Sequence, residues 1–163
     1  MHARMRRAFL FTAVAIPLAV ALGGTAFAQA VGTWKLNLAE SKFQQGLAPK
    51  STTLVYEAAG EGIKVTVDQV PADGPPIHYA VTANYDGKDV PVVGSPNGDT
   101  VARTRVNAKT TKLVNKKDGK ILSTVTIVTS ANGKMLTITS KGKDAKGQTI
   151  DGVAVYDLSL IHI

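Results

Sequence analysis

The sequence predicts an all-β protein, an up-and-down antiparallel β-barrel of about eight to ten strands. Three observations lead to this prediction. Short segments of alternating apolar and polar residues recur from Lys50 onward. Gly, Pro, Asn and Asp separate these segments, with turn centres roughly ten to fourteen residues apart. No intervening segment is long enough for a crossover helix, so each strand is expected to pair antiparallel with the strand before it.

A meander of this length has two ways to avoid an overlong open sheet. It can split into two packed sheets, or it can close on itself. Closure removes the exposed edges, which favours the barrel. A two-sheet β-sandwich is the alternative.

The first strand is expected to begin at Gly32-Thr33-Trp34, which holds the single tryptophan of the chain. One short helical stretch, of one or two turns, is expected at residues 38–46, because Gly46 and the following Pro49 are typical stop signals. Asp86-Gly87 predicts a hairpin turn. The remaining strands are expected at residues 51–58, 63–68, 77–85, 89–93, 100–106, 110–115, 121–130, 135–140 and 149–157. Pro91 indicates that the strand at 89–93 is bulged or lies at an edge.

Both ends of the chain are set apart from this pattern. Residues 1–28 are predicted to be a secretion signal, with a basic start, an apolar run and the small-x-small cleavage site Ala26-Phe27-Ala28. Adjacent arginines at Arg6-Arg7 leave open whether export uses the general or the twin-arginine route. Residues 29–157 are expected to form a single β-barrel domain. Residues 158–163 resemble the translated end of a common sequencing adapter and are interpreted as a non-native tail.

Composition narrows the classes of function. Removing the signal lowers the total of Lys and Arg from 19 to 16 against 12 acidic residues, so the net charge falls from +7 to +4. This modest charge predicts no nucleic-acid partner. The chain has no cysteine, which excludes thiol nucleophiles, thiolate metal sites and a lipoprotein anchor. We therefore expect an exported periplasmic or extracellular protein, monomeric and without stable membrane insertion once the signal is removed.

The opening Gly32-Thr33-Trp34-Lys35-Leu36 resembles the signature that begins lipocalins and fatty-acid-binding proteins, the calycin group. It is also similar to the opening of small exported bacterial proteins of unknown function. The resemblance implies a barrel around a small apolar ligand, with Gly32 and Trp34 in structural roles. In fatty-acid-binding proteins the last strand carries an Arg-x-Tyr pair that holds a carboxylate. Here Tyr156 matches that tyrosine, but the arginine position is Ala154, and the segment after the first strand is too short for a two-helix lid.

Five side chains are candidate ligand-binding residues. Arg103 and Arg105 are two residues apart and share one strand face. If that face is interior they form an anion site, because a buried arginine requires a partner; if it is exterior they are solvated. Tyr79 and Tyr85 also share a face, and Tyr156 shares its face with small residues that would leave space for a ligand.

No motif indicates catalysis. A nucleophile elbow, a phosphate loop and a metal motif are all missing from the sequence. His78 is the single histidine of residues 29–157, is expected to be exposed, and cannot form a multi-histidine metal site. We therefore predict a non-enzymatic barrel that binds a small apolar or amphipathic ligand, with no catalytic residues, metal or cofactor.

The alternative is a structural or interaction protein of the cell envelope, with a filled core and a functional surface at a lysine cluster. Its members are Lys109, Lys112, Lys116, Lys117 and Lys120.

Overall fold

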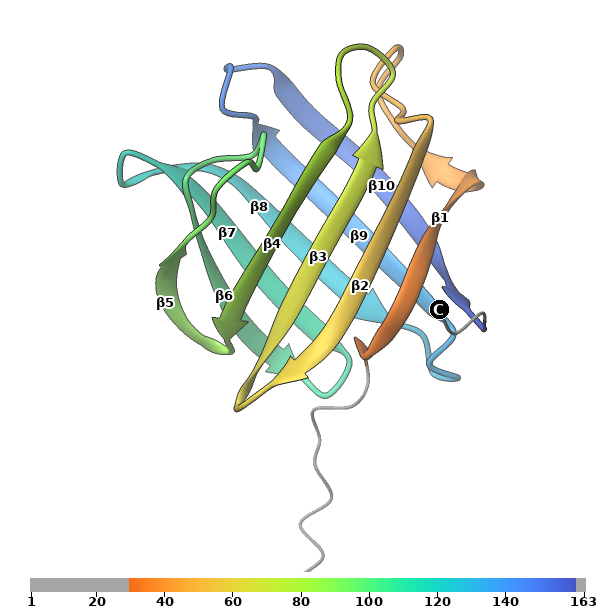
Figure 1. Cartoon of the computed structure of the whole chain (residues 1–163), viewed down its shortest axis with the longest axis vertical. Helices are drawn as coiled ribbons and strands as arrows, with labels where there is room; N and C mark the ends of the chain where they lie inside the picture. The colour runs from red at the N-terminus through yellow and green to blue at the C-terminus, as the bar shows by residue number, and fades with distance from the viewer. Residues whose placement is uncertain (1–29, 161–163) are drawn as a thin grey trace, which may run out of the picture.

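The computed structural model describes residues 30–160, and these residues form an antiparallel barrel that is nearly closed (Figure 1). The ten strands are β1 (Gly32–Lys42), β2 (Ser51–Ala59), β3 (Gly62–Val70), β4 (Ile77–Asn84), β5 (Asp86–Pro91), β6 (Thr100–Asn107), β7 (Thr110–Lys117), β8 (Lys120–Thr129), β9 (Met135–Lys143) and β10 (Thr149–Ser159). The predicted all-β barrel is confirmed. The expected signal at residues 1–28 and the end of the expected tail, residues 161–163, lie outside the described residues. No helix long and apolar enough to cross a membrane is found in residues 30–160.

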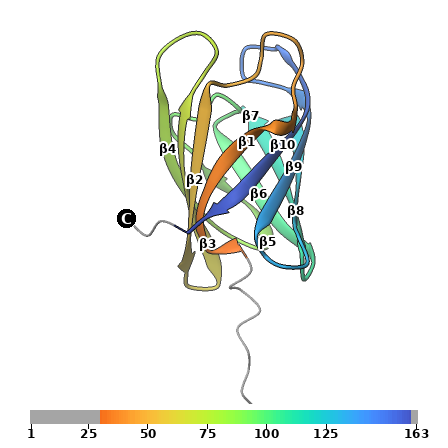
Figure 2. The ribbon, with the colours of Figure 1, turned by 90° about the vertical axis from the view of Figure 1, so that its right-hand side faces the viewer.

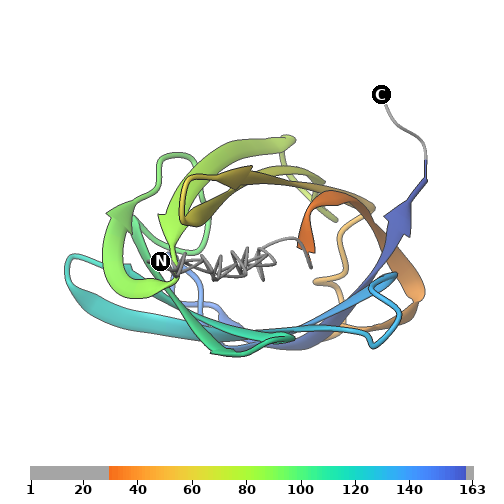
Figure 3. The ribbon, with the colours of Figure 1, turned by 90° about the horizontal axis from the view of Figure 1, so that it is seen from below.

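All ten strands belong to one sheet, in the order β4-β3-β2-β1-β10-β9-β8-β7-β6-β5. The first and last strands, β1 and β10, pair with each other in the wall (Figure 2). Viewed along its axis, the wall is a flattened ring of strands (Figure 3). The ring is open between β4 and β5, the two end strands of the sheet.

The open seam corrects the expectation that every strand pairs with the one before it. Strand β5 pairs with β6, and no ladder joins it to β4. Asp86-Gly87 is therefore not a hairpin turn. Gly87, with φ of 75°, instead lies where the β5–β6 register shifts between Asp86 and Asp89. The same backbone freedom that suits glycine to a turn here permits a bulge in an edge strand, as Pro91 indicated.

The expected helical turn at residues 38–46 is wrong, because β1 continues to Lys42. Asn37 lies opposite Val155 and Lys42 opposite Val153, so residues 38–41 bulge out against a single residue of β10. Side chains satisfy the backbone of this bulge. The hydroxyl of Ser41 donates to the carbonyl oxygen of Asn37 at 2.6 Å and accepts the N–H of Val155 at 2.9 Å. This contact with β10 holds the segment in the wall.

The loops at one end of the barrel and the short turns at the other define a mouth and a floor. The β1–β2, β3–β4 and β9–β10 loops lie together at the mouth, away from the start of β1 (Figure 2). The floor is packed around Trp34, Ile63 and Leu136, the largest fully buried side chains. The indole N–H of Trp34 donates to the carbonyl oxygen of Ala30 at 2.8 Å, so its polar atom is satisfied.

Two glycines give a test of the β8–β9 pairing. Gly142 and Gly147 both have positive φ, 133° and 82°. A Cβ at Gly142 would overlap the backbone oxygen of Leu122 and lie 2.6 Å from the Ser123 Cα, whereas Gly147 has open space around it. We expect Gly147→Ala to cost about 1 kcal/mol of unfolding free energy through backbone strain alone, and Gly142→Ala to cost clearly more. Urea unfolding of the two variants measures the difference; equal losses would show that the strands separate there at little cost.

Candidate binding cavity

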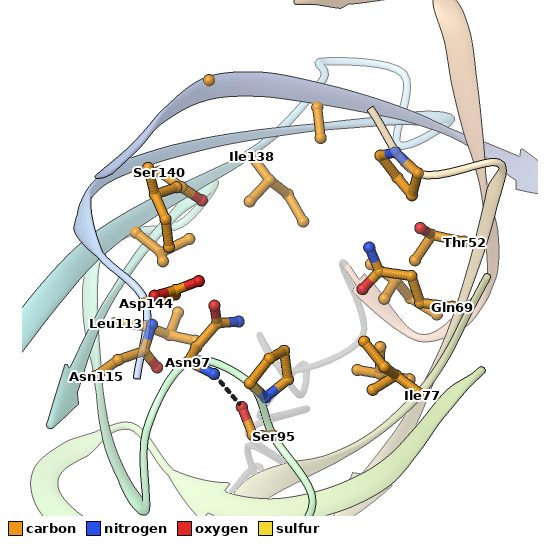
Figure 4. A pocket seen from close by; sticks show the side chains of 18 of the residues that line it. Thr52, Gln69, Ile77, Ser95, Asn97, Leu113, Asn115, Ile138, Ser140 and Asp144 are labelled. Atoms are coloured by element: carbon orange, nitrogen blue, oxygen red, sulfur yellow. Dashed lines mark hydrogen bonds between the residues drawn. The ribbon is translucent and has the colours of Figure 1, made fainter. Parts of the chain in front are cut away.

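The barrel encloses a cavity of about 430 Å³ that is continuous with the mouth (Figure 4). Its walls are the inward-facing positions of the strands, which alternate with outward-facing ones. The apolar lining includes Leu54, Val65, Val67, Ile77, Val81, Val92, Val101, Leu113, Val125, Ile127, Ile138, Ile150 and Ala154. Loop side chains at the mouth also contribute, among them Phe43, Gln44, Leu47, Pro49, Pro71 and Pro96. A cavity of this size and lining is typical of small-molecule sites.

Arg103 is a charged residue that is buried inside the barrel wall. It is 4% exposed, and its side chain lines the cavity from β6. No carboxylate of residues 30–160 forms an ion pair with it. Two tyrosines lie beside it: the Tyr85 ring centre is 5.9 Å from the guanidinium carbon, and the Tyr56 hydroxyl lies within its reach. A guanidinium withdrawn from water without a carboxylate partner is poised to take an anion.

Arg105 and Tyr85 lie apart from the main cavity. The guanidinium carbon of Arg105 is 4.0 Å from the Tyr85 ring centre, a cation–π contact. Both residues are half-buried and line a second, small pocket of about 20 Å³ near the floor. Arg103 lines both pockets, as do Tyr56 and Ile127. The structure therefore groups Arg103, Tyr79 and Tyr156 around the cavity and places Arg105 and Tyr85 below it.

Three tyrosine hydroxyls face the interior. Burial raises the pKa of Tyr56, of Tyr79 and of Tyr156, and for Tyr56 the nearby Arg103 partly offsets the effect. These phenols are therefore neutral donors and acceptors at neutral pH. The Thr52 hydroxyl lies next to that of Tyr156 without a well-formed bond to it, and it is the buried side-chain polar atom in residues 30–160 that has no hydrogen-bond partner. An orphaned hydroxyl in a cavity wall suits a polar ligand atom.

The buried phenols predict a loss of stability at alkaline pH. A raised pKa means that the folded barrel favours the neutral phenol, so this stabilisation is complete below the unfolded pKa of about 10 and is lost as the pH rises above it. We expect the free energy of unfolding, measured in urea from about pH 8 to about pH 11, to fall steeply above pH 10. Tyr156→Phe should make that fall shallower. An unchanged slope in this variant would contradict a contribution from Tyr156.

Polar side chains gather near the mouth, and none of them was predicted to be a site residue. Gln69 comes from β3, Asn115 from β7 and Ser140 from β9, while Asn97 and Asp144 come from loops (Figure 4). The sequence could have predicted the inward position of the three strand residues, because each lies two positions from an apolar residue and so shares its strand face. Asn115, for example, follows inward-facing Leu113.

The other candidate residues lie outside the cavity. Trp34 is in the floor, and the Leu158 side chain lies where a Cβ of Gly32 would be. His78 projects outward from β4 beside Asp68, with 2.5 Å between Nδ1 and Oδ1. Lys116 of the lysine cluster pairs with Asp89 at 2.8 Å. No group of three His, Asp or Glu side chains in residues 30–160 is arranged to hold a metal ion.

No protein-family model matches the chain, and no curated protein matches it significantly. One solved structure that it resembles is a redesigned β-barrel, mFAP1, bound to DFHBI. The TM-score is 0.40 and the sequence identity 12%, over 79% of this chain and 94% of that chain.

Proposed function

We propose that the protein is an exported, non-enzymatic barrel that binds a small amphipathic acid. The apolar part of the ligand occupies the cavity, and its acid group meets Arg103. Tyr56 supplies a hydroxyl beside that group, and Tyr156 lines the same cavity. The calycin-like opening at Gly32 and Trp34 agrees with a binding barrel of this kind.

Arg103 is the observation that carries the proposal. A buried guanidinium without a carboxylate is unfavourable in the empty protein, and an incoming anion supplies the missing partner. The arginine lies on β6 rather than at position 154 of β10. The anion is therefore held by a residue of β6, whereas the fatty-acid-binding pattern implied a residue of β10. A structural protein with a filled core would leave the cavity of about 430 Å³ unexplained.

Native mass spectrometry of the protein purified from its source cells without detergent tests this function. We expect an adduct that dissociates under collision and carries an acid group. Isothermal titration with saturated monocarboxylates from octanoate to hexadecanoate then provides a defined probe. A clean ligand-free mass, together with no heat of binding for any acid, would refute the proposal.

A further inference from the structure

The mouth of the cavity is polar, although the middle of the cavity is apolar. Gln69, Asn97, Asn115, Ser140 and Asp144 converge on it from five different elements (Figure 4). A barrel that only stored a hydrocarbon chain has no need of amides and a carboxylate along the path of that chain. These groups lie in the same upper layer as Thr52, which pairs in register with Gln69.

The hydrogen bonds inside the protein show which atoms remain available. The Nδ2 of Asn115 donates to the Ser123 hydroxyl at 3.0 Å, which leaves the Asn115 carbonyl oxygen open. Oδ1 of Asp144 accepts the backbone N–H groups of Lys146 and Gln148, at 2.9 Å and 2.8 Å, which leaves Oδ2 open. Both remaining atoms are acceptors. Asn115 and Asp144 therefore present acceptors to whatever occupies the cavity.

We infer that the ligand is polar at both ends, with its acid group at Arg103 and a hydrogen-bond donor, hydroxyl or ammonium, at the mouth. This inference rests on the proposed function and specifies its ligand class. A plain alkyl end would displace water from Asn115 and Asp144 and could not replace the hydrogen bonds that the water makes to them. A second acid group at the mouth would meet the Asp144 carboxylate, which repels it.

A matched ligand series tests the inference by isothermal titration. Its members are dodecanoate, its omega-hydroxy and omega-amino analogues, and dodecanedioate. We expect the hydroxy or the amino acid to bind about tenfold or more tighter than dodecanoate, and the diacid to bind most weakly. Preference for the hydroxy or the amino analogue identifies which donor the mouth accepts.

Two variants test whether residues of the mouth cause the preference for a donor-bearing ligand. Asn115→Leu should remove most of the advantage of the hydroxy acid and leave dodecanoate binding unchanged or stronger. Asp144→Asn keeps the Oδ1 acceptor for its loop, so that the loop stays folded, and should selectively weaken the amino acid. His78→Gln, on the outer wall, is the matched control and should change neither.

The outcomes separate this inference from the proposed function. Dodecanoate binding as tightly as both donor-bearing analogues would overturn the inference while leaving acid binding in place. A preference that survives both mouth variants would overturn it as well. Failure of all four compounds and of the longer and shorter monocarboxylates would overturn the proposed function itself.

Discussion

Replacing Arg103 with methionine is expected to stabilise the ligand-free protein by about 1–3 kcal/mol and to weaken the binding of an amphipathic acid by about tenfold or more. The guanidinium has left water, and within residues 30–160 no carboxylate forms an ion pair with it. The face of Tyr85 and the hydroxyl of Tyr56 recover only part of its lost hydration. Methionine fills similar space in the apolar wall without that cost.

Urea unfolding of ligand-free protein and titration with dodecanoate measure the two effects. Lys112→Met is the control, because Lys112 is exposed on the neighbouring strand β7, in register with Thr104. It removes one positive charge from the outside of the wall, and we expect the free energies of unfolding and of binding to change by no more than about 0.5 kcal/mol. Opposite signs for stability and binding at Arg103 are typical of a residue kept for its ligand. A destabilised R103M protein that still binds the acid would instead make Arg103 a structural partner of its two tyrosines.

Alternation along the chain was sufficient to predict most of the strands and most of their antiparallel pairing. A period of two is a local property, and almost every strand has it. The failures depended on distant partners. The bulge at residues 38–41 is held by a hydrogen bond from the Val155 N–H to the Ser41 hydroxyl. Val155 lies on the neighbouring strand β10, which is more than a hundred residues away in the sequence. Asp86-Gly87 has the composition of a hairpin turn, and only the pairing of β5 with β6 shows that it is not one.

The candidate site was predicted only in part, because sequence gives the face of a residue but not its depth. Arg103 and Arg105 share a face, as expected, yet one lines the main cavity and the other a pocket near the floor. Tyr79 and Tyr85 are separated in the same way. Gln69 and Asn115 were missed because an isolated polar residue in an alternating strand suggests an outward position. The strand face that such a residue shares with apolar residues predicts its inward position better than its polarity does.

Replacing Trp34 with alanine is expected to cost about 3–5 kcal/mol of unfolding free energy, a large part of the total for a domain of this size. The indole is completely buried and belongs to the same packed cluster as Leu54 and Leu136. It also holds the start of the described chain, through its hydrogen bond to Ala30. Removing it opens a cavity in the floor, where strands β1, β2 and β10 meet.

Trp34→Phe separates the two contributions of the indole, since it keeps an aromatic ring and loses the N–H donor. We expect it to cost about 1–2 kcal/mol, because the Ala30 carbonyl oxygen can still bond to water. Urea unfolding followed by circular dichroism measures both variants, because replacing the single tryptophan removes the fluorescence signal. Equal losses for alanine and phenylalanine would show that the floor collapses around the missing ring. Closure of the barrel would then depend on Ile63 and Leu136, and the Gly-x-Trp opening would act mainly through the indole hydrogen bond.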